Sequence, residues 1–149
     1  MGRIVAICVS ERKGTAKRQV PSAFLKKNWG LEGDDHAGKW HRQISLLPLK
    51  QAQMARQPAG AFGENLLVSG FDLKNLPIGT RIICGKCLLE ITQIGKECHS
   101  HCDIYKRTGD CVMPREGIFA VVIKGGHIRI GDELVIEKSA GQKSGLGLE

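Results

Sequence analysis

The 149-residue sequence has no long apolar run and no recognisable targeting segment. Its most apolar stretches, such as residues 118–123, are far shorter than the about 20 residues needed to cross a bilayer as a helix. Met1–Ile7 leads directly into a strand-like pattern and lacks the apolar region of a secretory signal. We therefore expect a cytoplasmic protein without a membrane partner.

Aromatic residues are also scarce, with four Phe, two Trp and one Tyr. The chain thus lacks the stacking platform of single-strand nucleic-acid binders, and no helix-based reader of DNA is recognisable. The formal net charge of +7 still favours an anionic partner. Because the lysines and arginines are spread along the chain, a small phosphorylated ligand is a better expectation than nucleic acid.

The cysteines are the most informative residues in the sequence. In a reducing compartment, six cysteines suggest metal or redox chemistry before disulfides. Half of them lie with two histidines and several cations in one short stretch: Lys96, Cys98, His99, His101, Cys102, Lys106, Arg107 and Cys111. Such a set suits zinc or another soft metal, a thiolate nucleophile or sulfur carrier, or a thiolate ligand for a cofactor-borne metal. The alternative is that some of these cysteines are small buried hydrophobes.

The rest of the sequence predicts a mainly β domain. Strand patterns recur with turn signals between them, at residues 3–10, 20–25, 43–47, 81–84, 87–94, 117–124, 127–130 and 133–136. The one convincing helix covers residues 48–56, and no crossover helices for a parallel sheet are evident. So many short strands usually form a closed or nearly closed β-barrel, here with a few short helices. We expect one domain over residues 1–138, followed by a flexible tail at 139–149.

Two glycine-punctuated loops contain further candidate site residues. In the first, Asp34, Asp35, His36 and His41 form either a hard-ligand metal site or, as is more usual, side chains that satisfy the loop backbone through Asx turns. In the second, Gly60 and Gly63 permit positive φ, so backbone amides there could face a ligand.

Four segments in order resemble the MOSC domain, named for the C-terminal domain of molybdenum-cofactor sulfurase. The resemblance covers nearly all of residues 2–136, and the order of the segments makes it specific. The segments are an opening strand with Lys13-Gly14 and Val20-Pro21; Gly30–Gly38 with Arg42–Leu47; Gly60–Leu66 with Gly70–Leu73 and Ile78-Gly79; and Cys98–Cys102 with Gly109–Phe119 and Ile130–Glu133.

The resemblance implies a barrel-like fold and a role in molybdenum-cofactor binding or sulfur transfer. In larger relatives a late cysteine ligates molybdenum or handles sulfur, and by position it corresponds best to Cys102, with Cys98 as the alternative and Cys111 as a third candidate. His99 and His101 join Cys98 and Cys102 as candidate metal ligands. Pyridoxal phosphate is a family association only, because it belongs to the separate desulfurase domain of the sulfurases. The resemblance does not decide between a binding module and an enzyme of sulfur transfer or molybdenum-dependent reduction.

A molybdenum-bound, phosphorylated pterin (molybdopterin) would need a soft metal ligand together with cationic or amide donors for its phosphate. The candidate donors are Arg42, Gly63, Glu64, Asn65, Lys96, Arg107 and Arg115. A molybdoenzyme or a sulfur-donor protein would then be the expected protein partner.

One feature departs from the family pattern. Cys84 and Cys87 flank a turn, and together with Cys98 and Cys102 they give a spacing that a zinc ribbon tolerates. The alternative function is therefore a structural zinc module that binds a protein or nucleic acid. Both cysteines, however, lie on an apolar hairpin, where burial in the core is the simpler interpretation.

Overall fold

The fold is described from a computed structural model, which describes residues 2–12, 16–54, 56, 58–70, 73–95 and 117–137. In this part of the chain the secondary structure is mainly β, as predicted, with one short α-helix and one 3₁₀ turn. The elements are β1 (Gly2–Val9), β2 (Arg18–Val20), β3 (Ser22–Lys26), β4 (Gly30–Leu31), β5 (Ile44–Pro48), α1 (Leu49–Met54), β6 (Leu66–Ser69), η1 (Leu73–Asn75), β7 (Arg81–Cys84), β8 (Cys87–Ile94), β9 (Ile118–Lys124), β10 (Gly126–Arg129) and β11 (Glu133–Ile136).

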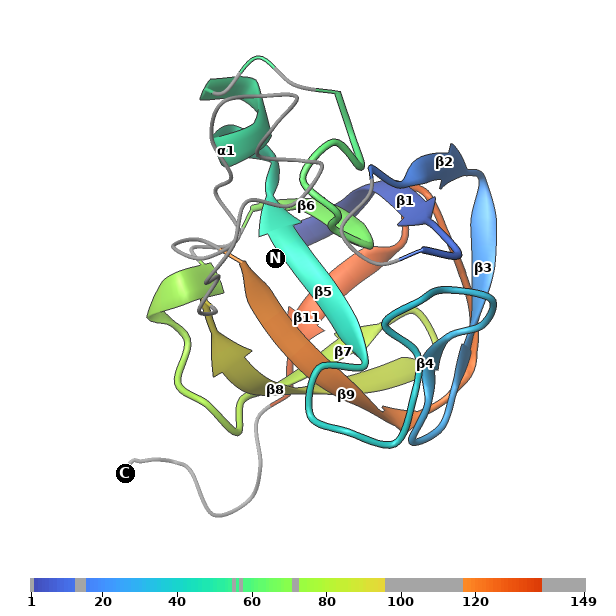
Figure 1. The fold of residues 1–149 in the computed structure, drawn as a ribbon. Coiled ribbons are helices and arrows are strands. Elements are labelled where there is room, and N and C mark those ends of the chain that lie inside the picture. The colour runs from blue at the N-terminus through green and yellow to red at the C-terminus, as the bar shows by residue number, and fades with distance from the viewer. Residues whose placement is uncertain are drawn as a thin grey trace.

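Seven strands close into a barrel (Figure 1). Their order is β11-β7-β8-β9-β5-β6-β1, and β1 pairs back onto β11 through Gly2 opposite Leu134. Strand β2 extends the sheet beyond β1, and β10, β3 and β4 form a smaller second sheet. Closure leaves no free edge within the ring, which is the usual solution for many short strands. The predicted barrel is confirmed.

The β7–β8 hairpin illustrates why the sequence forms these strands. Buried and less buried residues alternate along the first part of β8, as expected for a strand with one face in the core. The strands are joined by Gly85-Lys86, and Gly85 has a φ of +60°, which glycine adopts at little cost. The hairpin has the predicted bounds.

One pairing was not predicted. Strands β5 and β6 are parallel, with Leu46 opposite Leu66, and residues 49–65 connect them through α1. A parallel pair requires such a crossover, and this short helix begins that connection. The helix is also shorter than the predicted 48–56.

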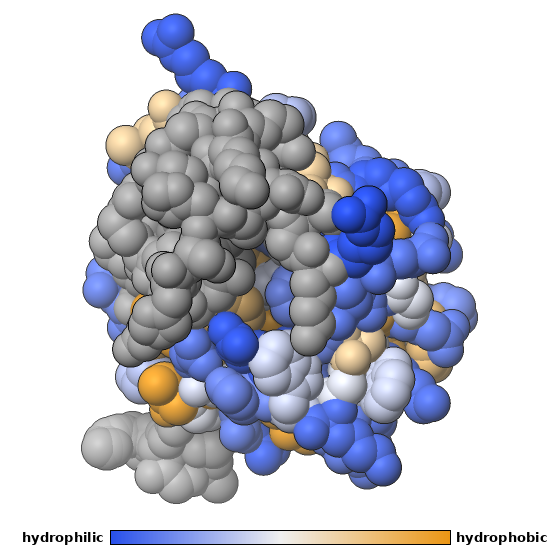
Figure 2. Space-filling model, viewed as in Figure 1, coloured by the Kyte–Doolittle hydropathy of each residue, from blue (hydrophilic) through white to orange (hydrophobic). Residues whose placement is uncertain are grey.

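The barrel interior is filled by aliphatic side chains from all seven strands, including Ile4, Ile7, Leu46, Ile82, Leu89 and Ile118. The coloured part of the face in Figure 2 is mostly hydrophilic, with isolated apolar spots. None of the helices in the described residues is long and apolar enough to span a membrane.

Candidate functional site

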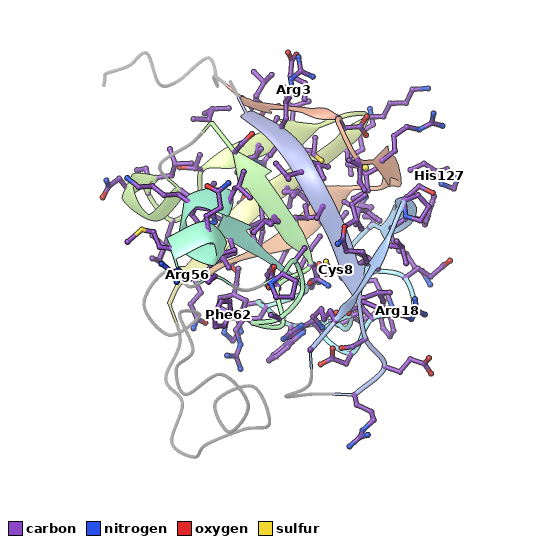
Figure 3. All side chains as sticks on the ribbon, turned by 90° about the horizontal axis from the view of Figure 1, so that it is seen from above. Arg3, Cys8, Arg18, Arg56, Phe62 and His127 are labelled. Atoms are coloured by element: carbon purple, nitrogen blue, oxygen red, sulfur yellow. The ribbon has the colours of Figure 1, made fainter. Side chains whose placement is uncertain are left out.

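The polar side chains of interest gather where β1 ends, which we call the Cys8 end of the barrel. Figure 3 shows Cys8 towards one end of β1 and Arg3 at the other, while His127 lies at the periphery, away from Phe62. His127 is exposed.

A buried lysine is the centre of this end. The Lys17 Nζ atom lies 2.9 Å from Asp34 Oδ1 and 2.6 Å from Asp35 Oδ1, and it donates to Ser10 Oγ at 3.1 Å. The three charged side chains are between 0% and 4% exposed. A buried ammonium needs paired carboxylates and further hydrogen bonds to offset its desolvation, and Lys17 has both. We call Lys17, Asp34, Asp35 and Ser10 the lysine network.

Asp34 is ionised in this network. Burial opposes ionisation, but the nearby His36 imidazole, the Lys17 ammonium and the backbone N–H of Ser10 together hold the pKa of Asp34 well below its usual range. The Asp34 Oδ2 atom also accepts the backbone N–H of His36 at 3.0 Å, which is the expected Asx-type contact. Asp34, Asp35 and His36 offer atoms within 4.8 Å of one another that could hold a metal, but Lys17 already supplies the cation there.

His36, Trp40, Arg42 and Phe119 form an adjoining cluster. The Trp40 indole N–H donates to the carbonyl of His36 at 2.7 Å, and the Arg42 guanidinium lies 4.6 Å from the Trp40 ring centroid. The ring of Phe119, at the start of β9, lies 5.6 Å from Arg42 Cζ and 6.5 Å from the His36 ring. Cation–π contacts of this kind fix a guanidinium without using its N–H donors.

Arg42 retains unused binding capacity. Its Nε atom is buried and has no hydrogen-bond partner, and among the described residues no ion pair of Arg42 is found. A buried guanidinium N–H without an acceptor is rare unless water or a ligand fills the position. The residue therefore fits an anionic group.

The loop that carries Arg42 is attached to the ends of β8 and β9. The Thr92 hydroxyl contacts the carbonyls of His41 and Phe119, and His41 Nε2 is 2.8 Å from Gln93 Oε1. The Gly95 N–H donates to the Gly117 carbonyl at 2.6 Å, so the chain just after β8 and just before β9 is still hydrogen-bonded where residues 96–116 begin and end. Both attachment points of that segment thus lie close to the loop of Arg42.

Residues 96–116 lie outside the described residues. They contain most of the predicted site: Lys96, Cys98, His99, His101, Cys102, Arg107, Cys111 and Arg115. The predicted tail at 139–149 also lies outside them. Among the predicted cofactor-binding residues, the structure describes Arg42, Gly63, Glu64 and Asn65.

The loop containing Gly63, Glu64 and Asn65 uses its amides internally. The backbone N–H groups of Gly60 and Phe62 donate to the Glu64 carboxylate, and Gly63 N–H donates to the Gly60 carbonyl. Burial raises the pKa of Glu64, while the Gly60 amide opposes this shift.

Asn65 binds the neighbouring strands instead of a ligand. Its backbone N–H donates to Ser45, its side-chain oxygen accepts the Ser45 N–H, and its Nδ2 donates to the Cys8 carbonyl. These three contacts join β5 and β1 to the start of β6. The backbone N–H groups of Gly60, Phe62 and Gly63 therefore bond within the protein and are not directed at a ligand.

The three described cysteines are core residues. Cys8, Cys84 and Cys87 are free thiols with at most 1% exposure, and the last two face each other across the β7–β8 hairpin. Burial raises the pKa of Cys8 and of Cys84 to about 12, and it also raises the pKa of Cys87. Cys84 and Cys87 are thus buried in the core, as the simpler interpretation of the hairpin predicted, and the other two cysteines of the ribbon spacing, Cys98 and Cys102, lie outside the described residues.

The family follows from the sequence and the barrel together. Residues 33–135 match the family model of the MOSC domain. The chain belongs to the MOSC domain family. The match contains the lysine network's carboxylates, Arg42, and the segment between β8 and β9.

Solved structures show the same fold as this MOSC domain. The YuaD protein of Bacillus subtilis has a TM-score of 0.73 at 21% identity, covering 90% of this chain and 94% of its own. YiiM of Geobacillus stearothermophilus gives 0.69 at 21% identity, with 93% and 76% covered, and YiiM of Escherichia coli gives 0.65 at 22%, with 94% and 72% covered. At these identities the likeness bears on the fold alone. No curated protein matches the sequence significantly.

Sequence reasoning missed the role of Lys17. A lysine in a basic, glycine-containing loop is normally solvated, and no spacing along the chain relates it to Asp34. The acidic pair and His36 were detectable because glycines flank them, and Arg42 because it precedes a strand in the MOSC pattern.

Proposed function

We propose that this MOSC domain binds molybdenum cofactor or carries sulfur through a cysteine in residues 96–116, with Arg42 holding the anionic part of its ligand. Cys102 is the preferred thiolate, with Cys98 and Cys111 as alternatives. The observation that carries the proposal is the Arg42 guanidinium, which has a buried, unpartnered Nε close to the two attachment points of the cysteine-bearing segment.

The chemistry of the chain's own residues is consistent with this role. A cysteine thiolate is a soft ligand for molybdenum and also the form that accepts a sulfur atom. Arg42 would orient a phosphate by charge-assisted hydrogen bonds from a guanidinium already fixed by two aromatic rings. Lys96, Arg107 and Arg115 are further candidate cations in the same segment of sequence, and His99 and His101 are further candidate metal ligands. Bound cofactor would supply a redox-active metal.

Elemental analysis and intact-mass spectrometry of the full chain, purified without added metal, test the proposal. We expect molybdenum, or a mass increment of one sulfur on a peptide containing Cys98 or Cys102. Cys102→Ser should lose the ligand, whereas the folded Cys84→Ser variant should keep it. Thermal unfolding of each variant would separate loss of ligand from loss of fold.

Two outcomes would reject the proposal. Retention of the ligand by the triple variant Cys98→Ser/Cys102→Ser/Cys111→Ser would exclude a thiol of this segment. Stoichiometric zinc that is lost equally from Cys84→Ser and Cys102→Ser would instead establish the zinc-ribbon alternative.

A further inference from the structure

A cavity of about 460 Å³ lies where the β7–β8 hairpin turns, next to the end of β9 and the start of β10. Its volume is within the range of about 300–1,000 Å³ that small-molecule sites in proteins occupy. We call it the hairpin cavity. The side chains that define its chemistry are Ile83, Lys86, Cys87, Leu88, Lys124 and Glu137.

The hairpin cavity is separate from the proposed cofactor segment. Cys87 begins β8 and Lys124 ends β9, whereas residues 96–116 follow the end of β8 and precede the start of β9. The eight residues of β8 span roughly 23 Å at about 3.3 Å a residue. A ligand in this cavity would therefore lie at the other end of β8 from Thr92, which contacts the loop of Arg42.

One wall of the hairpin cavity is apolar and continues along the outside of the barrel. Cross-strand neighbours form a row there: Val135 on β11, Ile83 on β7, Leu88 on β8 and Lys124 on β9. Ile83 and Val135 are each 37% exposed, and Leu88 is half-buried. A continuous apolar surface of this kind, ending at a charged residue, is typical of a binding site and not of singly scattered apolar residues.

The absence of a side chain at Gly126 keeps the hairpin cavity open. A Cβ at this position would lie 3.3 Å from the Cys87 sulfur and 3.8 Å from Lys86 Cβ. Any larger side chain would therefore enter the space beside two lining residues. Cys87 is only 1% exposed, so its thiol lies at the bottom of the cavity.

Two lysines lie at the mouth of the hairpin cavity. Lys86 and Lys124 are exposed, and among the described residues neither forms an ion pair. Glu137 supplies a carboxylate, so two positive charges and one negative charge give the described lining a net charge of +1. The nearby Asp132 carboxylate accepts the backbone N–H of Arg129 at 2.9 Å and so belongs to its own turn. The cavity thus combines an apolar wall with an excess of positive charge.

We propose that the hairpin cavity binds a small amphipathic anion. Its apolar chain lies against Ile83 and Leu88, and its acidic head lies at the mouth, where Lys86 and Lys124 attract it. Burial of the chain supplies most of the affinity, and the lysines select for negative charge. The inference is independent of the proposed function, because these residues take no part in it.

Octanoate is the probe, because it joins a carboxylate to an apolar chain that is small enough for the hairpin cavity. Amide NMR of the full chain, at octanoate concentrations without micelles, measures its binding. We expect saturable shifts of the Gly85, Lys86 and Gly126 resonances with a Kd on the order of 1 mM, and no shift of Gly60 at the Cys8 end. Acetate, which lacks the chain, and octylammonium, which has the opposite charge, should each bind at least about tenfold more weakly.

Variants of single lining residues test the two parts of the ligand separately. Lys86→Gln and Lys124→Gln should each weaken octanoate binding about fivefold, because each removes one surface charge, and Glu137→Gln should strengthen it. Leu88→Ala should also weaken it about fivefold, because less apolar surface is buried. Lys50→Gln is the matched control, because Lys50 is an exposed lysine of α1 that does not line the cavity. These side chains lie outside the barrel core, and thermal unfolding would verify that each variant is folded.

Three results would reject the inference: octanoate shifts no resonance of the hairpin cavity, octylammonium binds as tightly as octanoate, or Lys50→Gln weakens binding as much as Lys86→Gln and Lys124→Gln do. The proposed function is decided separately by the molybdenum or sulfur content. Cys102→Ser should lose that content and still bind octanoate with wild-type affinity. A chain that holds molybdenum or sulfur but binds no octanoate would keep its proposed function and lose this second site.

Discussion

Replacing Lys17 by Met tests whether the lysine network holds the Cys8 end together. The substitution keeps the length of the side chain but leaves Asp34 and Asp35 buried, at 0% and 4% exposure, without their cation. Removing one partner of a buried ion pair typically costs about 3–5 kcal/mol of unfolding free energy. Since domains have only about 5–15 kcal/mol in total, we expect a loss of about a fifth or more of the stability.

The matched control is Arg81→Met. Arg81 and Glu90 form an ion pair with a similar separation, 3.0 Å, but their side chains are 45% and 31% exposed. Solvent screens such pairs, so this loss should be at most about 1 kcal/mol. The two variants therefore compare a buried with an exposed ion pair at a nearly equal N–O distance.

Urea unfolding followed by circular dichroism would measure both losses, and thermal unfolding should show a fall of about 6–20 °C for Lys17→Met. The triple variant Lys17→Met/Asp34→Asn/Asp35→Asn should recover part of the stability, because it removes the unpaired charges. Equal losses in Lys17→Met and Arg81→Met would refute the reasoning, since the network would then contribute no more than a surface pair.

Three further predictions concern pH, backbone geometry and thiol reactivity. The pKa of Asp34 is lower in the folded than in the unfolded state, so the contribution of its ionised carboxylate to the unfolding free energy should be complete above the unfolded pKa of about 3.9 and be lost as pH falls below it. Urea unfolding at several acidic pH values would measure this loss, and Asp34→Asn should flatten the pH dependence. Gly60→Ala should lower the unfolding free energy by about 3 kcal/mol or more, because Gly60 has a φ of +85° and an added Cβ would clash with the Lys17 carbonyl oxygen. Gly79→Ala is the control: Gly79 has a φ of +96° but open space around it, so its loss in the same urea assay should be only about 1–2 kcal/mol. Native protein at about pH 8 should resist alkylation at Cys8, Cys84 and Cys87, because burial raises their pKa values above the ordinary thiol value of about 8.5, and mass spectrometry should detect modification only after denaturation.

The barrel was predictable because its strands are local patterns. The alternation along β8 and the glycine turn before it depend on residues close in sequence, and they gave the hairpin its observed bounds. The parallel pairing of β5 with β6 was not predictable in this way, because it joins segments separated by the crossover that contains α1.

The site was less predictable than the fold because its contacts are tertiary. Lys17 and Asp34 are separated by other strands, so the sequence shows a solvated lysine and an acidic loop where the structure has one buried network. The loop before β6 was expected to offer its amides to a ligand, yet Glu64 accepts two of them internally. A carboxylate two residues from the amide of Phe62 satisfies that donor locally, which composition alone does not reveal.

The lysine network also explains how the long, flexible side chain of Arg42 is held in one position at the Cys8 end. Asp34, held by Lys17, accepts the N–H of His36, and the carbonyl of His36 accepts the indole N–H of Trp40. Trp40 in turn stacks against Arg42. Each contact orders the next, so the guanidinium loses its freedom on folding and not on binding a ligand. Pre-ordering of this kind lowers the entropic cost of association. Under the proposed function, the affinity of Arg42 for an anion would therefore depend on Lys17, a residue outside the Arg42 contacts.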